Sequence, residues 1–146
     1  MFCNQCEQTA KGESCTKIGV CGKNEEVAAL QDLLIHAVQG LALFAHEGRK
    51  QGVVDHEADH FTFQAFFSTL TNVDFDPDRF IEPINRAVSL RQAMKEKVAA
   101  AGGRIDFPED AASFTPAGNL SGLVEQGQAL DFVNSLDEDE NIRSLK

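Results

Sequence analysis

The sequence predicts an all-α fold: a three-helix bundle with a fourth, weaker helix, preceded by an irregular cysteine-rich loop. Apolar residues recur at helical spacing over three long segments, and no segment alternates between apolar and polar residues as a half-buried strand does. All four cysteines lie in the first 21 residues, which show no hydrophobic period. We therefore divide the chain into a cysteine-rich loop at 1–23, a helical bundle at 24–136 and the start of a further helical unit at 137–146.

The first helix is predicted over residues 24–47. Asn24 is a good N-cap, and the two glutamates that follow it suit the positive end of the helix dipole. Gly48 is interpreted as the residue that ends the helix, since glycine readily adopts the left-handed conformation found there. His36 is predicted to lie off the apolar stripe, at the surface or its boundary. The stripe itself consists of Val27, Leu30, Leu34, Ala37, Val38, Leu41, Phe44 and Ala45.

A second helix is predicted to begin at Asp55 and to end near Thr71. We expect its three clustered phenylalanines to belong to the hydrophobic core, because large apolar side chains on one helical face are usually buried. The residues that share this face are Phe63, Phe66, Phe67 and Leu70.

A third helix is predicted from Asp76, its N-cap, to the glycine pair at 102–103. Pro77 follows the cap at the first helical position, where proline is favoured. Pro83 falls inside the helix and is expected to bend its first turns. The apolar stripe comprises Phe80, Ile84, Ala87, Val88, Arg91 through its aliphatic stem, Met94 and Val98.

The remainder of the chain is less regular. Residues 102–118 are rich in glycine and proline and are predicted to form a long surface loop. A weaker helix is predicted from about Asn119 to Leu136, interrupted by glycines that lower helix propensity. Residues 139–146 align without gaps to residues 24–31, with a capping residue, acidic residues and apolar residues at matching positions. This match indicates the opening of another helix, which is either a frayed terminal stub or, the interpretation that we favour, the start of a second helical unit in a longer protein.

Composition excludes some classes of partner. The 146 residues are enough for one domain with a hydrophobic core, and the formal net charge is −10. This charge argues against nucleic acid and anionic membranes, which attract lysine and arginine, and it is compatible with a basic redox partner. No apolar run approaches the roughly 20 residues that span a bilayer, and the N-terminus lacks the features of a secretory signal. We therefore expect a cytoplasmic protein, whose thiols stay reduced.

The cysteines are spaced as C-x2-C-x8-C-x5-C, at Cys3, Cys6, Cys15 and Cys21. Four thiolates on one short segment can converge on one metal ion or one iron–sulfur cluster. Zinc is usually held by two CxxC pairs, and only the first pair has that spacing here, whereas wider spacings suit a larger cubane. Spacing alone leaves two hypotheses: an iron–sulfur electron-transfer module, or a structural zinc-binding helical module that acts in protein interaction. Disulfides are the least favoured.

The segment from His56 to His60 reads H-E-x-x-H, the pattern of zinc peptidases. That chemistry needs both histidines on one face in the middle of a helix, together with a third ligand. Here the motif falls in the first turn after Asp55, where acidic residues suit the helix dipole. We interpret it as a coincidence of a helix start.

The N-terminal run MFCNQCEQTAKGESCTKIGVCGK resembles the start of the hybrid-cluster proteins, also called prismane proteins. The segments at 30–42 and 66–76 are similar to the next two characteristic stretches of that family, so the resemblance covers essentially the whole chain. It implies that Cys3, Cys6, Cys15 and Cys21 bind a cubane [4Fe-4S] cluster.

The resemblance further implies a longer oxidoreductase, a hydroxylamine reductase that forms ammonia or reduces nitric oxide. Its electrons would come from a redox partner such as an NADH-dependent reductase, and the remaining domains of the parent protein would be further partners. In that family a second, hybrid cluster is held by residues of later domains, cysteines among them. This chain has no cysteine beyond Cys21 and so lacks those ligands. By itself it is expected to bind the cubane without catalysis, and no catalytic residue is assigned.

Overall fold

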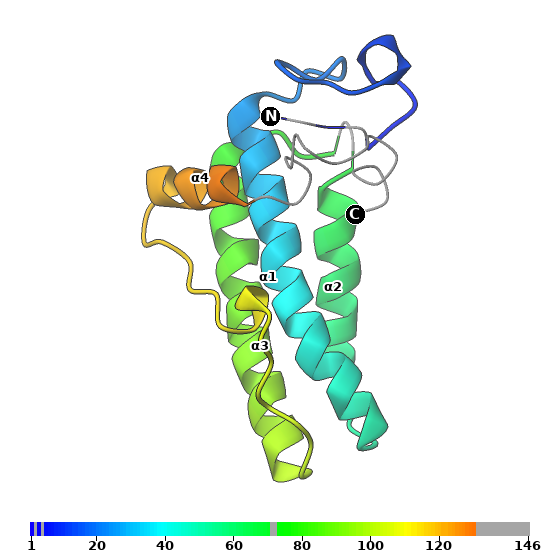
Figure 1. Cartoon of the computed structure of the whole chain (residues 1–146), viewed down its shortest axis with the longest axis vertical. Helices are drawn as coiled ribbons and strands as arrows, with labels where there is room; N and C mark the ends of the chain where they lie inside the picture. Colours follow the sequence, from blue (N-terminus) through cyan, green and yellow to red (C-terminus); the bar gives the residue numbers. More distant parts are fainter. Residues whose placement is uncertain (2, 4, 71–72, 131–146) are drawn as a thin grey trace.

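The structure, a computed structural model, describes residues 1–130 apart from Phe2, Asn4 and residues 71–72. Three helices run along the long axis of the molecule: α1 (Glu25–Lys50), α2 (His56–Ser68) and α3 (Ile81–Ala100) (Figure 1). A fourth helix, α4 (Leu120–Ala129), lies across one end of this bundle. No β-strand occurs in this part of the chain, so the all-α prediction is confirmed.

The core is centred on α1, which packs against α2, α3 and α4. Its predicted stripe is buried from Val27 to Ala45. The predicted caps Asn24 and Asp76 accept backbone hydrogen bonds, and so do Asp55 and Asn119 at the predicted starts of the other two helices. By length and composition α1 is also apolar enough to cross a membrane, but 72% of its most apolar window is buried inside the bundle. The apolarity of α1 is thus explained by its central position. The largest fully buried side chains include Phe44, Phe80, Leu30, Leu33, Leu34, Leu41, Ile84, Met94 and Leu123.

The prediction that Gly48 ends the first helix is wrong, because α1 continues to Lys50. The stop signal is instead Gly52, two residues beyond the helix end, which has a φ of 75° and donates to the carbonyl of Arg49 at 3.2 Å. Val53 donates to the carbonyl of Gly48 at 2.8 Å, which completes a Schellman motif. A Cβ at position 48 would lie 3.2 Å from Cε of Met94. Gly48 therefore packs closely against the Met94 and Val98 side chains of α3.

The prediction that the clustered phenylalanines of α2 lie in the core is also wrong. Phe63 is 70% exposed, Phe66 47% and Phe67 54%, and the buried residues of α2 are Ala58, Phe61 and Ala65. Two apolar faces compete on this helix, and the one that carries alanines turns inward because small side chains allow close approach. The helix ends at Ser68, and the predicted end at Thr71 lies outside the described residues.

The third helix begins as predicted. Asp76 accepts from the Asp78 N–H at 3.1 Å and starts a short 3-10 helix, η2 (Pro77–Phe80), which leads into α3. Pro83 falls in the first turn of α3, where its missing N–H removes no helical hydrogen bond. The bend expected at Pro83 stays a prediction. At the other end, Gly102 has a φ of 76° and Gly103 donates to the carbonyl of Val98 at 2.9 Å, which forms a second Schellman motif.

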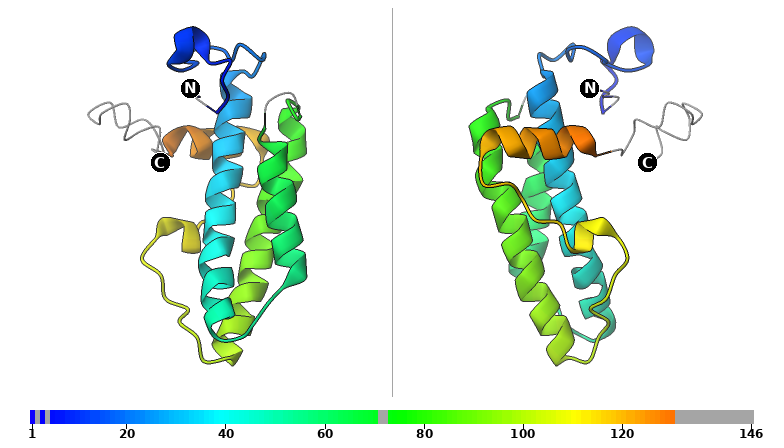
Figure 2. Two further views of the ribbon diagram at one scale, coloured as in Figure 1. Left: turned by 90° about the vertical axis from the view of Figure 1, so that its right-hand side faces the viewer. Right: turned by 60° about the vertical axis from the view of Figure 1, so that its left-hand side comes forward.

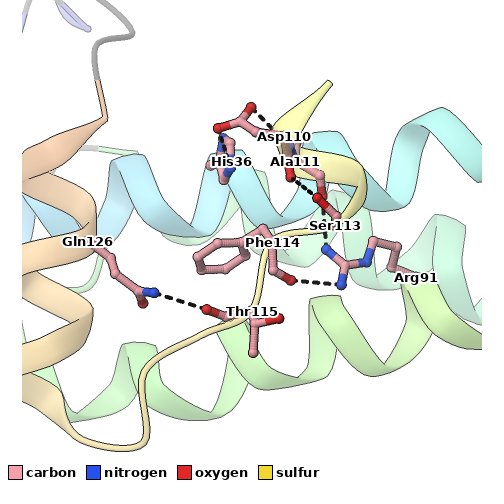
Figure 3. Close-up of polar contacts among 8 residues, drawn as sticks. All are labelled: His36, Arg91, Asp110, Ala111, Ser113, Phe114, Thr115 and Gln126. Atoms are coloured by element: carbon pink, nitrogen blue, oxygen red, sulfur yellow. Dashed lines mark hydrogen bonds and ion pairs between the residues drawn. The ribbon is translucent and has the colours of Figure 1, made fainter. Parts of the chain in front are cut away.

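The predicted surface loop at 102–118 is partly buried against α1 and α3 (Figure 3). It contains the short 3-10 helix η3 (Asp110–Ala112), in which Ala111 is buried. Arg91 of α3 buries its whole side chain and not only the predicted stem, since its guanidinium donates to the carbonyls of Ala111 at 2.9 Å and Phe114 at 2.8 Å. This arginine therefore fixes the loop to the bundle.

His36 is buried, contrary to the prediction of a surface or boundary position. Its Nε2 lies 3.7 Å from Oδ2 of Asp110, and its ring meets the Phe114 ring edge-on at a centroid distance of 5.3 Å (Figure 3). Burial lowers the pKa of His36, although the Asp110 carboxylate opposes this shift. The loop at 102–118 thus buries His36 and supplies its polar and aromatic partners, although the periodicity of α1 predicted a boundary position.

The fourth helix crosses α1 near its N-terminal end (Figure 2). Gly127 makes this crossing close, because a Cβ there would lie 2.1 Å from the carbonyl oxygen of Ala29. The helix ends at Ala129, earlier than the predicted Leu136. Residues 131–136 lie outside the described residues, as does the further helical unit predicted at 137–146.

Candidate metal centre

The cysteine-rich loop lies over the N-terminal end of α1 (Figures 1 and 2). Its only regular element among the described residues is a single 3-10 turn, η1 (Ala10–Gly12). The loop is joined directly to the helix through Asn24, whose side chain accepts from the Val27 N–H at 2.8 Å. The loop that carries the candidate ligands is thus attached directly to the most buried helix of the bundle.

Two of the four cysteines face each other across a backbone bridge. Cys3 donates to the carbonyl of Cys15 at 3.0 Å, and Cys15 donates to the carbonyl of Cys3 at 2.8 Å. Residues paired in this antiparallel way carry their side chains on the same side of the bridge. Cys15 is buried, Cys3 is half-buried, and all four cysteines are free thiols. The fold therefore brings together residues that are twelve positions apart in the sequence.

The other two cysteines belong to separate turns. The carbonyl of Cys6 accepts from the Thr9 N–H at 3.2 Å, and the turn around Cys21 is closed by a bond from Gly22 to the carbonyl of Gly19 at 2.8 Å. A Cβ at position 19 would lie 3.0 Å from Sγ of Cys21, so glycine leaves room for that sulfur. Within the described residues, no three cysteine, histidine or acidic side chains are grouped as a metal site. The structure pairs Cys3 with Cys15 but does not gather all four sulfurs.

The donor set fits an iron–sulfur cluster or zinc, because soft thiolates are the ligands that both prefer. A buried lysine adds to this fit. Lys23 is only 3% exposed, and its Nζ lies 4.0 Å from Sγ of Cys3 and 3.0 Å from Oε1 of Gln5. The Lys23 side chain thus reaches from the end of the loop to the first of the four cysteines. Sequence reasoning missed Lys23, because a single lysine between a glycine and a helix cap has no distinctive local pattern.

A carboxyl group completes the charged surroundings of the loop. Burial raises the pKa of Asp32, on α1, from 3.8 to about 6, although the positive charges of Lys23 and of the N-terminal amine oppose this shift. Asp32 thus stands close to the cysteine loop in a desolvated position. Asp32 lies in the first third of α1, toward the end that carries the cysteine loop, but sequence reasoning did not single it out.

The H-E-x-x-H segment starts α2, with Asp55 as its cap. Asp55 accepts from the N–H groups of Glu57 at 3.0 Å and Ala58 at 3.2 Å. Glu57 forms an ion pair with Arg86 at 3.5 Å, and Asp59 forms one with Arg49. These contacts fit the interpretation of the motif as a helix start held by surface ion pairs. That it binds no zinc remains a prediction.

The fold and the site together define the class of protein: an all-α domain that carries a cysteine-rich loop at the end of its central helix. The family model described as "Prismane/CO dehydrogenase family" matches residues 1–141. The chain therefore belongs to the Prismane/CO dehydrogenase family. This membership agrees with the resemblance to the hybrid-cluster proteins, which is seen in the cysteine-rich N-terminal run and in the segments at 30–42 and 66–76.

Several curated proteins named hydroxylamine reductase align with the whole of this chain. Identity is 60% to the protein of Syntrophobacter fumaroxidans, 54% to that of Methanocella arvoryzae and 42% to that of Trichormus variabilis. In each case the alignment takes in 100% of this chain but only 27% of the relative. The chain thus spans about 27% of the length of these relatives and corresponds to their N-terminal portion.

Proposed function

We propose that Cys3, Cys6, Cys15 and Cys21 ligate a cubane [4Fe-4S] cluster, and that this chain is the electron-transfer portion of a longer hydroxylamine-reducing protein. Membership of the Prismane/CO dehydrogenase family and relatives named hydroxylamine reductase support this proposal. The four ligands are the only cysteines of the chain. Sulfur ligands for a second cluster would come from elsewhere in the longer protein.

The observation that carries the proposal is the position of Lys23 beside the Cys3–Cys15 pair. A buried ammonium group is costly unless a negative partner compensates it. The Nζ of Lys23 contacts the neutral Gln5 oxygen at 3.0 Å and the Cys3 sulfur at 4.0 Å. Asp32 is a negative neighbour of Lys23 when ionised. A thiolate at Cys3, as in a ligating cysteine, would be a second and would lie next to the ammonium group.

When bound, the cluster would supply one-electron transfer. The chain's own residues would hold it at an accessible end of the molecule, since Ile18 and Val20 of the same loop are 62% and 63% exposed. We propose that a redox partner, such as an NADH-dependent reductase, approaches there, and that the acidic chain favours a partner with a basic surface. A cytoplasmic location, where thiols stay reduced, is part of the same proposal.

Anaerobic purification and reconstitution test the ligand assignment. We expect about four irons and four sulfides per chain, a broad absorption band near roughly 400 nm, and a paramagnetic signal on one-electron reduction. Single Cys→Ser variants at the four positions should each lose most of the iron. One zinc per chain without colour would instead establish the structural zinc-binding module.

Two further variants sharpen this experiment. Lys23→Met removes the buried charge with little change of length, so it should retain the iron but shift the midpoint potential to more negative values. His60→Ala is the matched control, because His60 lies in the H-E-x-x-H segment of α2 and should affect neither iron content nor potential. An unchanged potential in Lys23→Met would refute the role given to Lys23.

A further inference from the structure

The outer side of α2 carries an apolar surface that we call the aromatic face. It consists of Phe63, Phe66, Phe67 and Leu70, which are 70%, 47%, 54% and 44% exposed. The rings of Phe63 and Phe67 stack on one another with centroids 6.4 Å apart. Single exposed apolar residues are common on proteins, but a contiguous group of this kind marks an interaction surface.

The aromatic face points away from the rest of the bundle. Ala58, Phe61 and Ala65 occupy the inward side of α2, which packs against α1 and α3. The loop at 102–118 contacts α1 and α3, and α4 packs on α1, away from α2 (Figures 1 and 2). The face also adjoins the cysteine-rich loop, since Nε2 of Gln5 donates to Oγ1 of Thr69 at 3.3 Å.

Charge indicates what kind of partner this face accepts. Residues 61–70 contain no charged side chain, although 25% of the chain is charged and its net charge is −10. The cores of permanent interfaces are depleted in charged residues, whereas surfaces that attract a transient redox partner or a lipid headgroup carry them. The aromatic face is therefore suited to a permanent apolar contact.

We propose that, in the longer protein, polypeptide that follows residue 146 packs on the aromatic face of α2. The relatives are almost four times as long as this chain, which spans 27% of their length, so most of such a protein lies outside these residues. This inference rests on the proposed function only in assuming that the chain is one portion of a longer protein. It does not depend on whether the four cysteines bind a cluster.

Photo-crosslinking tests this docking. Residues 1–146 are joined to the remaining part of the Syntrophobacter fumaroxidans relative, with p-benzoylphenylalanine at position 63. We expect cross-links to peptides that follow residue 146. The same probe at Ile105, which is 40% exposed in the 102–118 loop, is the matched control and should capture them at least about tenfold less. The proposal would be overturned if no cross-links form, or if they reach only residues 1–146 of the same or a second copy. Equal capture from position 105 would also overturn it.

A second measurement separates docking from folding. Amide exchange of α2 should be about tenfold slower in the joined protein than in the 146-residue chain. The double variant Phe63→Glu/Phe67→Glu should abolish this difference, whereas Ile105→Glu should preserve it. In the 146-residue chain the double variant should leave the thermal midpoint within a few degrees of the unsubstituted protein, because both rings are exposed. Equal exchange in both proteins, or slow exchange that persists in the joined double variant, would refute docking at this face. Iron content reports on the cysteines separately.

Discussion

Gly127 of α4 lies against the backbone of Ala29 in α1, so closely that a Cβ at position 127 would stand 2.1 Å from the Ala29 carbonyl oxygen. No rotation of a side chain can relieve this contact, because both partners are backbone. The substitution Gly127→Ala should therefore displace α4. We expect the free energy of unfolding to fall by about 1–3 kcal/mol. This net loss already includes a gain of about 1 kcal/mol, because alanine has a higher helix propensity than glycine. Chemical denaturation followed by circular dichroism measures the loss.

Gly118→Ala provides the matched control for this prediction. A Cβ at position 118 would meet no atom within 4 Å. We expect a change in the free energy of unfolding of less than about 0.5 kcal/mol. Equal stability of the two variants would show that α4 does not depend on the close crossing at Gly127.

Arg91 supports the 102–118 loop through two carbonyl groups, those of Ala111 and Phe114. In Arg91→Lys the single ammonium group cannot reproduce the fork of a guanidinium, so at least one of these carbonyls loses its donor. We expect a loss of about 1–3 kcal/mol in the free energy of unfolding and faster proteolysis within 102–118. Limited proteolysis followed by mass spectrometry locates the cleavage sites.

The comparison for Arg91 is Arg86→Lys, on the same helix. Arg86 is 41% exposed and pairs with Glu57 at 3.5 Å. An exposed pair of this kind contributes less than about 1 kcal/mol, so this variant should resist proteolysis as the unsubstituted protein does. If Arg91→Lys were equally resistant, the loop would be held by its apolar contacts alone.

Asp55 caps α2 and also forms an ion pair with Lys97 of α3 at 2.5 Å. Asp55→Asn keeps a capping oxygen and loses the ion pair, whereas Asp55→Ala loses both and should cost about 1–2 kcal/mol of stability. The hydrogen bond from Lys97 is the main cause that lowers the pKa of Asp55. The stabilisation by the carboxylate is thus present above the ordinary pKa of 3.8 and is lost as pH falls through the lower folded-state value. Unfolding curves of the Asn variant and the unsubstituted protein should therefore converge in acid.

Local signals predicted most helix boundaries of this fold. The caps at Asn24, Asp55, Asp76 and Asn119 and the stop at Gly102 depend on hydrogen bonds within a few residues, which the sequence displays directly. The misplaced end of α1 has a different cause. Gly48 and Gly52 are both glycines near the end of the stripe. Gly48 packs within the helix against Met94 and Val98, whereas Gly52 has the positive φ of the helix stop.

Contacts between distant segments could not be predicted in this way. Periodicity shows that Phe63 and Phe67 share a face of α2, but not that the alanine face is the one turned inward. His36 and Arg91 are buried by a loop whose position no local pattern specifies. In the candidate site, spacing identified the cysteines as a group, whereas the pairing of Cys3 with Cys15 and the approach of Lys23 required the folded chain.

Asp32 gives the last prediction, a dependence of stability on pH with the opposite sign to that of Asp55. Burial raises its pKa to about 6, so between about pH 4 and pH 6 the folded protein binds a proton that the unfolded chain has released. Its contribution to stability is complete below the ordinary value of 3.8 and is lost as pH rises through about 6. Asp32→Asn cannot ionise and should remove this loss.

We expect Asp32→Asn to raise the free energy of unfolding by about 1–2 kcal/mol at pH 8 and to leave it nearly unchanged at pH 4. Urea denaturation at a series of pH values measures the difference. Glu125→Gln, at an exposed position of α4, is the matched control and should give the same profile as the unsubstituted protein. A constant difference between Asp32→Asn and the unsubstituted protein across this range would contradict the assignment, because it would show that the carboxyl group of Asp32 does not change its protonation on folding.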